Sequence, residues 1–282
     1  MMAMLTGMPA AAEHRVEESG ILQVMRKQAL PDLIHSIADK KKIPHLRVLN
    51  TEGDVHDFRA EPYLLQAYKE TTEEGVQCKL LEALGKLHDP ALFGWFVQRL
   101  NDPSIGIQCF AIWALGELRK SRAIAPLRKK LWSQNRFVQM TAIDAMGKTG
   151  QNSEVASELC LFLHDDEVQI RFLAAKALHG TAGIDDAPEL MDTLMQEPSL
   201  DVQEALAETL GHSGGIVAAG HFIELLKNPP TPATEHWAEV GLAAGQPDII
   251  SPLLKPLVES GDFRLRLSAE RVLKGFDRKM TP

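Results

Sequence analysis

One short sequence recurs along most of this chain at an almost constant interval. Its copies include "LLEALGKL" (80–87), "AIWALGEL" (111–118), "AIDAMGKT" (142–149), "AAKALHGT" (174–181) and "LAETLGHS" (206–213). The residue after the Ala-Leu pair, or its equivalent, serves as a marker at Gly85, Gly116, Gly147, His179, Gly211, Leu242 and Lys274, in steps of 31 or 32 residues. A fixed period of this length is typical of repeat proteins, in which each unit buries its apolar face against its neighbours.

Each repeat is predicted to contain two α-helices. In the first, apolar residues recur at three- and four-residue spacings, as in Ile107, Phe110, Ala111, Ala114 and Leu115, which form one face of a helix. A polar turn follows the marker, and a second segment then carries apolar pairs four residues apart. These pairs are Phe96 and Leu100, Leu127 and Leu131, Leu159 and Leu163, Leu190 and Leu194, Phe222 and Leu226, and Leu254 and Val258.

Prolines mark the expected ends of several second helices. They occur in Asp102-Pro103, Glu197-Pro198 and Asn228-Pro229, and proline cannot continue a helix. Because no strand-like alternation of any length appears, the sequence predicts an all-α fold. We expect an α-solenoid of about six stacked antiparallel helical hairpins with caps.

The repeat pattern also predicts the domain organisation. We expect a disordered leader over 1–15, an N-terminal helical cap or irregular repeat over 16–72, and the repeat array with a C-terminal cap over 73–282. No stretch approaches the roughly 20 apolar residues needed to span a membrane.

Charge and cysteine content narrow the function classes. A net charge of −8 argues against a protein that coats nucleic acid, since such binding depends on many basic contacts to phosphate. The three cysteines, Cys78, Cys109 and Cys160, are widely spaced, which suits buried thiols in a reducing compartment. The sequence therefore favours a cytoplasmic protein.

The repeats resemble HEAT repeats of the short type named after the bilin (phycobilisome) lyases, with a unit similar to D-x-x-V-R-x-x-A-x-x-A-L-G over about 73–280. That family usually pairs a loop Asp with an Arg six residues later. The resemblance implies such a pair between Asp165 and Arg171, whereas Gln108 and Gln203 stand where the Arg would follow Asp102 and Glu197.

The resemblance also raises several alternative functions. It allows a bilin lyase-like subunit that attaches a tetrapyrrole or helps to assemble a cofactor-bearing complex. Deoxyhypusine hydroxylases resemble this fold but carry His-Glu dipeptides for two iron ions, and this chain has none. HEAT-like DNA glycosylases use a basic face over several repeats, whereas many acids occur here between Glu154 and Glu208.

No catalytic or metal-binding pattern is present. The chain lacks Cys-x-x-Cys and His-x-x-x-His spacing, and a phosphate-binding glycine loop is also missing. His56-Asp57, His88-Asp89 and His164-Asp165 are interpreted as loop or helix-end positions rather than metal ligands. We therefore predict no catalytic residues, no metal and no cofactor.

Basic residues concentrate in one part of the chain. Seven of them lie between Arg119 and Arg136, with no acid between Glu117 and Asp144. This run is either an anion-binding patch for an acidic partner or a solvated helix face. The leading hypothesis is a non-catalytic scaffold that binds a protein partner with an acidic surface along its second helices. The predicted contact residues are Trp95, Arg99, Arg128, Lys129, Lys130 and Trp132.

Overall fold

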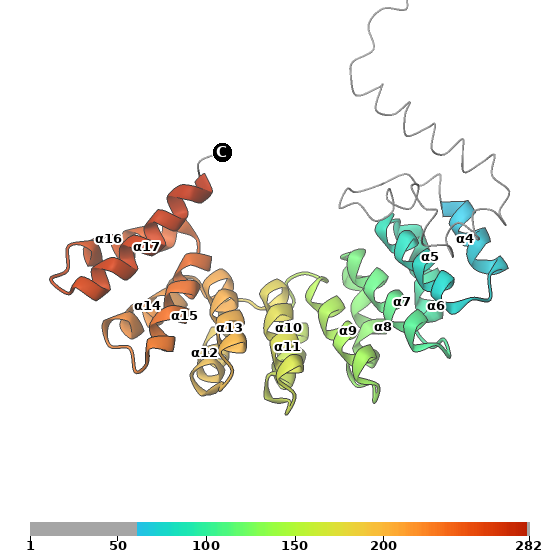
Figure 1. Ribbon diagram of the computed structural model, residues 1–282, viewed down its shortest axis with the longest axis horizontal. Helices are drawn as coiled ribbons and strands as arrows, with labels where there is room; N and C mark the ends of the chain where they lie inside the picture. The colour runs from blue at the N-terminus through green and yellow to red at the C-terminus, as the bar shows by residue number, and fades with distance from the viewer. Residues whose placement is uncertain (1–60, 281–282) are drawn as a thin grey trace, which may run out of the picture. The chain divides into compact units, whose positions relative to one another are not determined.

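The computed structural model describes residues 61–280 of the chain (Figure 1). Over this range the chain is helical and contains no β-strand. The described residues form two compact units, which meet in the sequence at Leu118 and Arg119. The predicted all-α solenoid fold is confirmed.

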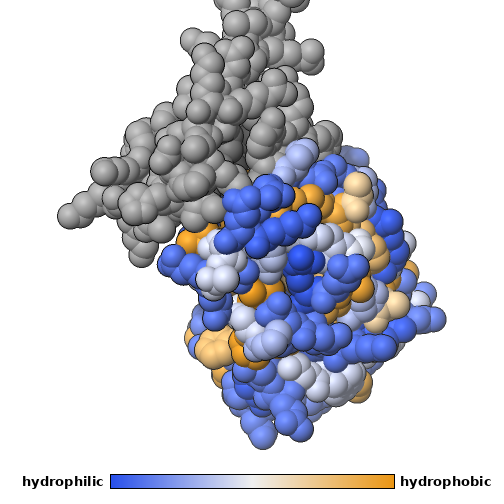
Figure 2. Space-filling model, turned by 90° about the vertical axis from the view of Figure 1, so that its right-hand side faces the viewer, coloured by the Kyte–Doolittle hydropathy of each residue, from blue (hydrophilic) through white to orange (hydrophobic). Residues whose placement is uncertain are grey.

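Unit 1 contains four α-helices among its described residues, and one short 3-10 turn. They are α4 Glu61–Glu70, α5 Glu74–Lys86, η2 Pro90–Leu92, α6 Phe93–Arg99 and α7 Ile105–Glu117. Helix α5 packs against both α4 and α7, and α6 packs against α7. Figure 2 shows one end of the molecule, where hydrophilic residues cover most of the described surface and hydrophobic ones are scattered between them.

Unit 2 contains ten α-helices over 119–280. They are α8 Ile124–Leu131, α9 Arg136–Gly147, α10 Ser153–Cys160, α11 Val168–Thr181, α12 Ala187–Gln196, α13 Leu200–Ser213, α14 Gly215–Lys227, α15 Pro232–Ala244, α16 Pro247–Val258 and α17 Phe263–Met280. Three 3-10 turns precede or extend second helices, namely η3 Ser121–Ala123, η4 Leu161–His164 and η5 Ile184–Asp186.

The apolar pairs of the second helices lie in the core as predicted. Eleven of the twelve residues are buried, and Val258 is half-buried. Each of the three predicted proline breaks falls between two helices. The last helix, α17, continues as far as Met280.

Two kinds of helix packing build unit 2. The first helices of successive repeats, α9, α11, α13, α15 and α17, lie side by side. Each second helix packs against the first helix of the following repeat, as α10 does against α11 and α12 against α13. Neighbouring repeats are therefore joined through both of their helices.

Marker glycines allow the first helices to approach closely. A Cβ atom at Gly147 would lie 2.6 Å from the Cα of Ala177 on the next first helix. A Cβ at Gly211 would overlap the carbonyl oxygen of Gly241 on α15. Glycine at these positions is thus required by backbone contact between repeats.

The loops before the first helices repeat the same hydrogen bonds. The Gln108 side chain donates to the Asp102 carbonyl at 2.7 Å, and Gln203 donates to the Glu197 carbonyl at 2.7 Å. In the same loops the Asp102 and Glu197 carboxylates accept from the backbone N–H two residues later. These bonds satisfy backbone groups that the end of one helix and the start of the next leave without partners.

The carboxylate–guanidinium pairing differs from the pairing that the family resemblance implies. Arg171 donates to the backbone carbonyl of Asp165 at 2.9 Å, but its guanidinium binds the Glu197 carboxylate of the next repeat at 2.9 Å. The Asp165 carboxylate instead binds Arg136 of the preceding repeat at 3.1 Å. The Asp165 and Arg171 side chains therefore do not pair with each other, and their charges instead form a ladder that joins successive repeats.

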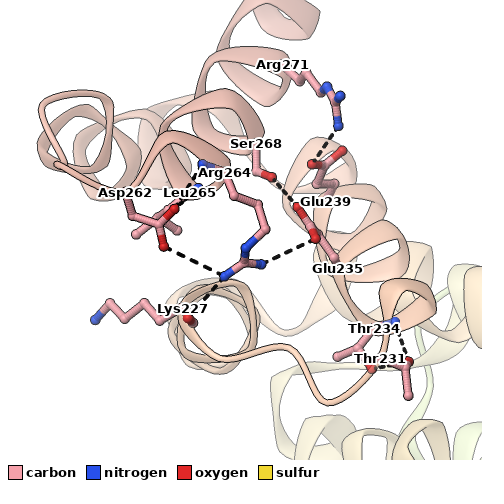
Figure 3. Close-up of polar contacts among 10 residues, drawn as sticks. All are labelled: Lys227, Thr231, Thr234, Glu235, Glu239, Asp262, Arg264, Leu265, Ser268 and Arg271. Carbon is pink, nitrogen blue, oxygen red and sulfur yellow. Dashed lines mark hydrogen bonds and ion pairs between the residues drawn. The ribbon is translucent and has the colours of Figure 1, made fainter.

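A polar cluster joins α15 to α17 near the end of the described chain (Figure 3). The Arg264 guanidinium lies 3.3 Å from Glu235 Oε2 and donates to the carbonyl of Lys227 at 3.2 Å. Ser268 donates to the other oxygen of Glu235 at 3.1 Å. Arg264 and Ser268, the two partners of Glu235, both lie on α17. This cluster therefore attaches the last helix to the preceding repeat.

The domain boundaries stay a prediction. The predicted leader over 1–15 and most of the predicted cap over 16–72 lie outside the described residues. Within that cap, α4 is a helix that packs against α5. No helix within 61–280 combines the length and the apolar character needed to cross a membrane.

Candidate functional site

The six predicted contact residues divide between the two units. Trp95 and Arg99 lie on α6 in unit 1. Arg128, Lys129 and Lys130 lie in the last turn of α8 in unit 2, and Trp132 is the residue that ends that helix. They therefore form two clusters, one in each unit.

The unit 1 cluster is an aromatic stack around one cation. Trp95 meets Tyr68 of α4 edge to face, with ring centroids 5.0 Å apart. The Arg99 guanidinium carbon lies 3.4 Å from the Trp95 ring centroid, and Arg99 Nη1 donates to the Trp95 carbonyl at 2.7 Å. Burial lowers the pKa of Arg99 from its usual value, while bonding to Tyr68 opposes this effect. Trp95 and Arg99 thus hold α6 to α4 and offer only part of their surface to solvent.

Arg128 in unit 2 is bound to the following repeat. Its Nε atom lies 2.7 Å from Oε1 of Glu158, and its Nη2 atom lies 3.3 Å from Oε2 of Glu154, both on α10. The hydrogen bond to Glu158 raises the pKa of Arg128. The charge that we expected to face a partner is therefore matched by two carboxylates of the same unit.

Arg136, at the other end of the basic run, is paired in the same way. It lies 3.1 Å from Asp165 and 2.9 Å from Glu167 in the loop before α11. Both arginines join repeats, so the positive charge available on this side of unit 2 is smaller than the sequence indicates.

The two lysines differ in environment. Lys129 is exposed, whereas Lys130 is half-buried and its burial lowers the pKa of its ammonium group. Lys129 precedes Trp132 by three residues, and residues at this spacing are neighbours on a helix surface. Lys129 is thus the cation best placed to act together with Trp132.

Trp132 is the most exposed tryptophan of the predicted set. Its side chain has 58% of its surface exposed, and its ring lies 5.1 Å from that of the buried Phe162. Trp132, the buried Phe162 and Leu161, which is also 58% exposed, line a hollow of about 350 Å³ whose remaining walls are polar and include Asp165 and Asp166. Large apolar groups in this setting are typical anchors for a protein partner.

The predicted loop roles of the His-Asp dipeptides are confirmed where the structure describes them. Asp89 starts η2 and accepts a hydrogen bond from the Ala91 N–H at 2.7 Å. Asp165 accepts from the Glu167 N–H at 2.9 Å, and His56-Asp57 lies outside the described residues. Within 61–280 no group of three or more His, Cys, Asp or Glu side chains is arranged to hold a metal ion.

The three cysteines lie in helices and form no disulfide among the described residues. Cys160 on α10 is buried, and burial raises its pKa to about 12. Cys78 and Cys109 are half-buried on α5 and α7, so the prediction of buried thiols holds fully only for Cys160.

One surface feature was missed at the sequence level. A groove of about 520 Å³ runs between α11 and α13, with Val168, Phe172 and Leu173 on one wall and Asp201, Glu204 and Glu208 on the other. The spacing of Val168 and Phe172 looks like that of core residues in an amphipathic helix, and only the packing reveals that they face a groove.

Comparison with known proteins agrees with this architecture. The profile of the family described as HEAT repeats matches residues 94–179. No curated protein sequence matches the chain.

Three solved structures match this chain at low sequence identity. A designed armadillo repeat protein is 17% identical, with a TM-score of 0.41, and the match covers 65% of this chain and 99% of that one. Human deoxyhypusine hydroxylase in complex with glycerol is 17% identical, with a TM-score of 0.37 and coverages of 92% and 99%. The complex of CpcE and CpcF of phycocyanin lyase from Nostoc sp. PCC7120 is 16% identical, with a TM-score of 0.47 and coverages of 88% and 94%.

The family match lies within a stack of helical hairpins that repeat every 31 or 32 residues. Residues 94–179 of this chain therefore consist of HEAT repeats.

Proposed function

We propose that this protein is a non-catalytic scaffold that binds a partner protein through the surface around Trp132 in unit 2. We define the Trp132 surface as Lys129, Lys130, Trp132 and Leu161. The observation that carries the proposal is the exposed Trp132 ring, which rests on Phe162 beside the exposed Leu161. A tryptophan held in place by a buried ring loses little conformational freedom on binding, which favours its role as an anchor.

The partner is proposed to carry an acidic segment. Arg128 and Arg136 are each matched by two carboxylates, so the exposed Lys129 supplies the attraction in this proposal. Arg128 contributes indirectly, since its bonds to α10 hold the end of α8 in place. Such charges act mainly on the rate of association and depend on ionic strength.

Trp95 and Arg99 are proposed as a second contact in unit 1. Because Trp95 stacks on both Tyr68 and Arg99, its side chain is held in place. Trp95 and Arg99 both remain partly exposed to solvent. Substitution of Arg99 would also disturb the packing of α6 on α4. The clearer test of this contact is therefore Trp95→Phe, which keeps an aromatic ring.

The proposal is tested by affinity capture from the source cell, followed by mass spectrometry of the bound proteins. The bait is the full chain, compared with Trp132→Ala and with Lys129→Glu/Lys130→Glu. Matched controls are Phe263→Ala, which removes an exposed ring from α17, and Lys255→Glu, which reverses an exposed charge on α16. We expect both Trp132-surface variants to lose the same partner, and both controls to retain it.

Two results would argue against this function. Retention of every captured protein by both variants would exclude the Trp132 surface. A shifted visible absorption band on mixing the purified chain with a bilin would instead favour the lyase-like role that the family resemblance implies.

A further inference from the structure

A second surface, on the first helices of unit 2, has the properties of a peptide-binding groove. We define the α11–α13 groove as the space of about 520 Å³ lined by Met140, Val168, Phe172, Leu173 and Ala205, with Asp201, Glu204 and Glu208 on its α13 rim. Val168 and Phe172 are four residues apart on α11, and Asp201, Glu204 and Glu208 follow a spacing of three and four on α13. Both walls therefore run along the helix axes, and the groove is elongated in that direction.

Exposed apolar side chains also lie at the start of the first helices, and one of them, Val168, lines the groove. Phe137 on α9 is 72% exposed, Val168 on α11 is 44% exposed, and Leu200 on α13 is 63% exposed. These residues begin three successive first helices that lie side by side (Figure 1). First turns of helices usually favour polar or acidic residues, so a row of apolar ones forms an unusual surface.

The charge on the rim is predominantly negative. Lys176 on α11 binds Glu208 at 2.9 Å, and this pair is neutral as a whole. Asp201 and Glu204 add two carboxylates, and His236 of α15 lies 3.8 Å from Glu204. A bound segment would therefore meet apolar groups at its centre and carboxylates along one edge.

We propose that the α11–α13 groove binds a basic amphipathic helix of a partner protein. The apolar lining suits side chains that project from one helix face at i, i+3 or i+4, and i+7. The carboxylates on the α13 rim complement Lys or Arg residues that flank that face. This site is separate from the Trp132 surface, and its partner has the opposite charge. A result that rejects one of the two proposals therefore leaves the other unaffected.

A labelled peptide provides the test. The probe is a synthetic helix of about 15 residues with Leu at the anchor spacing and Lys elsewhere, and its binding to the full chain is followed by fluorescence polarisation. A second probe replaces every Lys with Glu. We expect the Lys probe to bind, the Glu probe to bind at least about tenfold more weakly, and the affinity for the Lys probe to fall with salt.

Variants locate the binding to the groove. Phe172→Ala and Asp201→Asn/Glu204→Gln are each expected to weaken the Lys probe about tenfold. Because a chain of net charge −8 attracts any basic peptide, the matched control is Glu189→Gln/Asp192→Gln, which removes two exposed acids from α12. Circular dichroism checks that each variant is folded, and Trp132→Ala is expected to bind the probe normally.

Several outcomes would overturn the proposal. Absence of binding by the Lys probe, or an equal loss in the α12 control, would show that the groove does not select a basic helix. A dimer of the wild-type chain that Phe172→Ala converts to a monomer, measured by light scattering, would identify a second copy of the chain as the occupant instead.

Discussion

Arg171 on α11 and Glu197 after α12 form two hydrogen bonds between adjacent repeats, 2.9 Å from Nε to Oε2 and 3.0 Å from Nη2 to Oε1. Only 12% of the Arg171 side chain and 3% of the Glu197 side chain are exposed. The Glu197 carboxylate also accepts from the Ser199 N–H at 2.9 Å. One carboxylate therefore joins two repeats and orders the loop before α13.

Arg171→Ala is expected to lower the free energy of unfolding by about 3 kcal/mol, because it leaves the buried Glu197 carboxylate without its cation. The midpoint of urea denaturation measures this effect. The matched control is Arg136→Ala, since Arg136 makes the equivalent link but is 45% exposed. It should cost much less stability, because solvent screens its ion pairs. Equal losses in the two variants would show that burial does not set the strength of these links.

Gly211→Ala is expected to destabilise the chain by about 2 kcal/mol or more, because the new methyl group would overlap the Gly241 carbonyl. Gly220→Ala is the control, since a Cβ at Gly220 on α14 has no atom within 4 Å. Alanine there should stabilise the helix by up to about 1 kcal/mol. Thermal denaturation of both variants measures the difference. A stable Gly211→Ala variant would contradict the close approach of α13 and α15.

Cys160 is expected to resist alkylation in the native protein. Its burial raises the thiol pKa to about 12, so the reactive thiolate is scarce and shielded even at mildly alkaline pH. Iodoacetamide labelling followed by peptide mass spectrometry should modify the half-buried Cys109 before Cys160. In urea the two should react at similar rates. Rapid native labelling of Cys160 would show that α10 opens readily from its neighbours.

His179 is expected to reduce stability as the pH falls. Its ring stacks on that of His212 with centroids 4.4 Å apart, and partial desolvation lowers its pKa below the ordinary value of 6.5 although the residue is exposed overall. The unfolded state therefore binds a proton more readily than the folded state, so the stabilising contribution is full above about pH 6.5 and declines as the pH falls towards the folded-state pKa.

This pH effect is measured from urea midpoints at about pH 7.5 and about pH 5.5. His179→Gln should lose less stability on acidification than the wild-type chain does. His221→Gln, which changes an exposed histidine on α14, should behave like the wild type. An unchanged pH dependence in His179→Gln would assign the effect to other groups.

The helices and their buried faces could be predicted from the sequence because the same local pattern recurs. Phe96 and Phe222 occupy the same position in their repeats, and both are fully buried. The marker glycines also occur at one position, and those at 147 and 211 contact the next first helix. Each repeat thus supplies independent evidence for the same structure, which makes such an inference secure.

The pairing of charges could not be predicted in the same way. Arg128 and Glu158 are thirty residues apart, and only the register of one repeat on the next brings them within 2.7 Å. The sequence does not show that register, so Arg128 and Arg136 looked free to bind a partner, whereas they pair with the following repeat. The α11–α13 groove was missed for a related reason, because Phe172 has the spacing of a core residue and faces a surface that two helices create together.

The packing of each second helix on the following first helix has a consequence for engineering. The unit that can be removed or duplicated cleanly begins at a second helix and ends at the next first helix, as α12 with α13 does. A deletion of residues 184–213, from η5 through α13, would remove one such pair. Cutting instead in the loop between a second helix and the following first helix would separate two helices that bury each other's apolar residues.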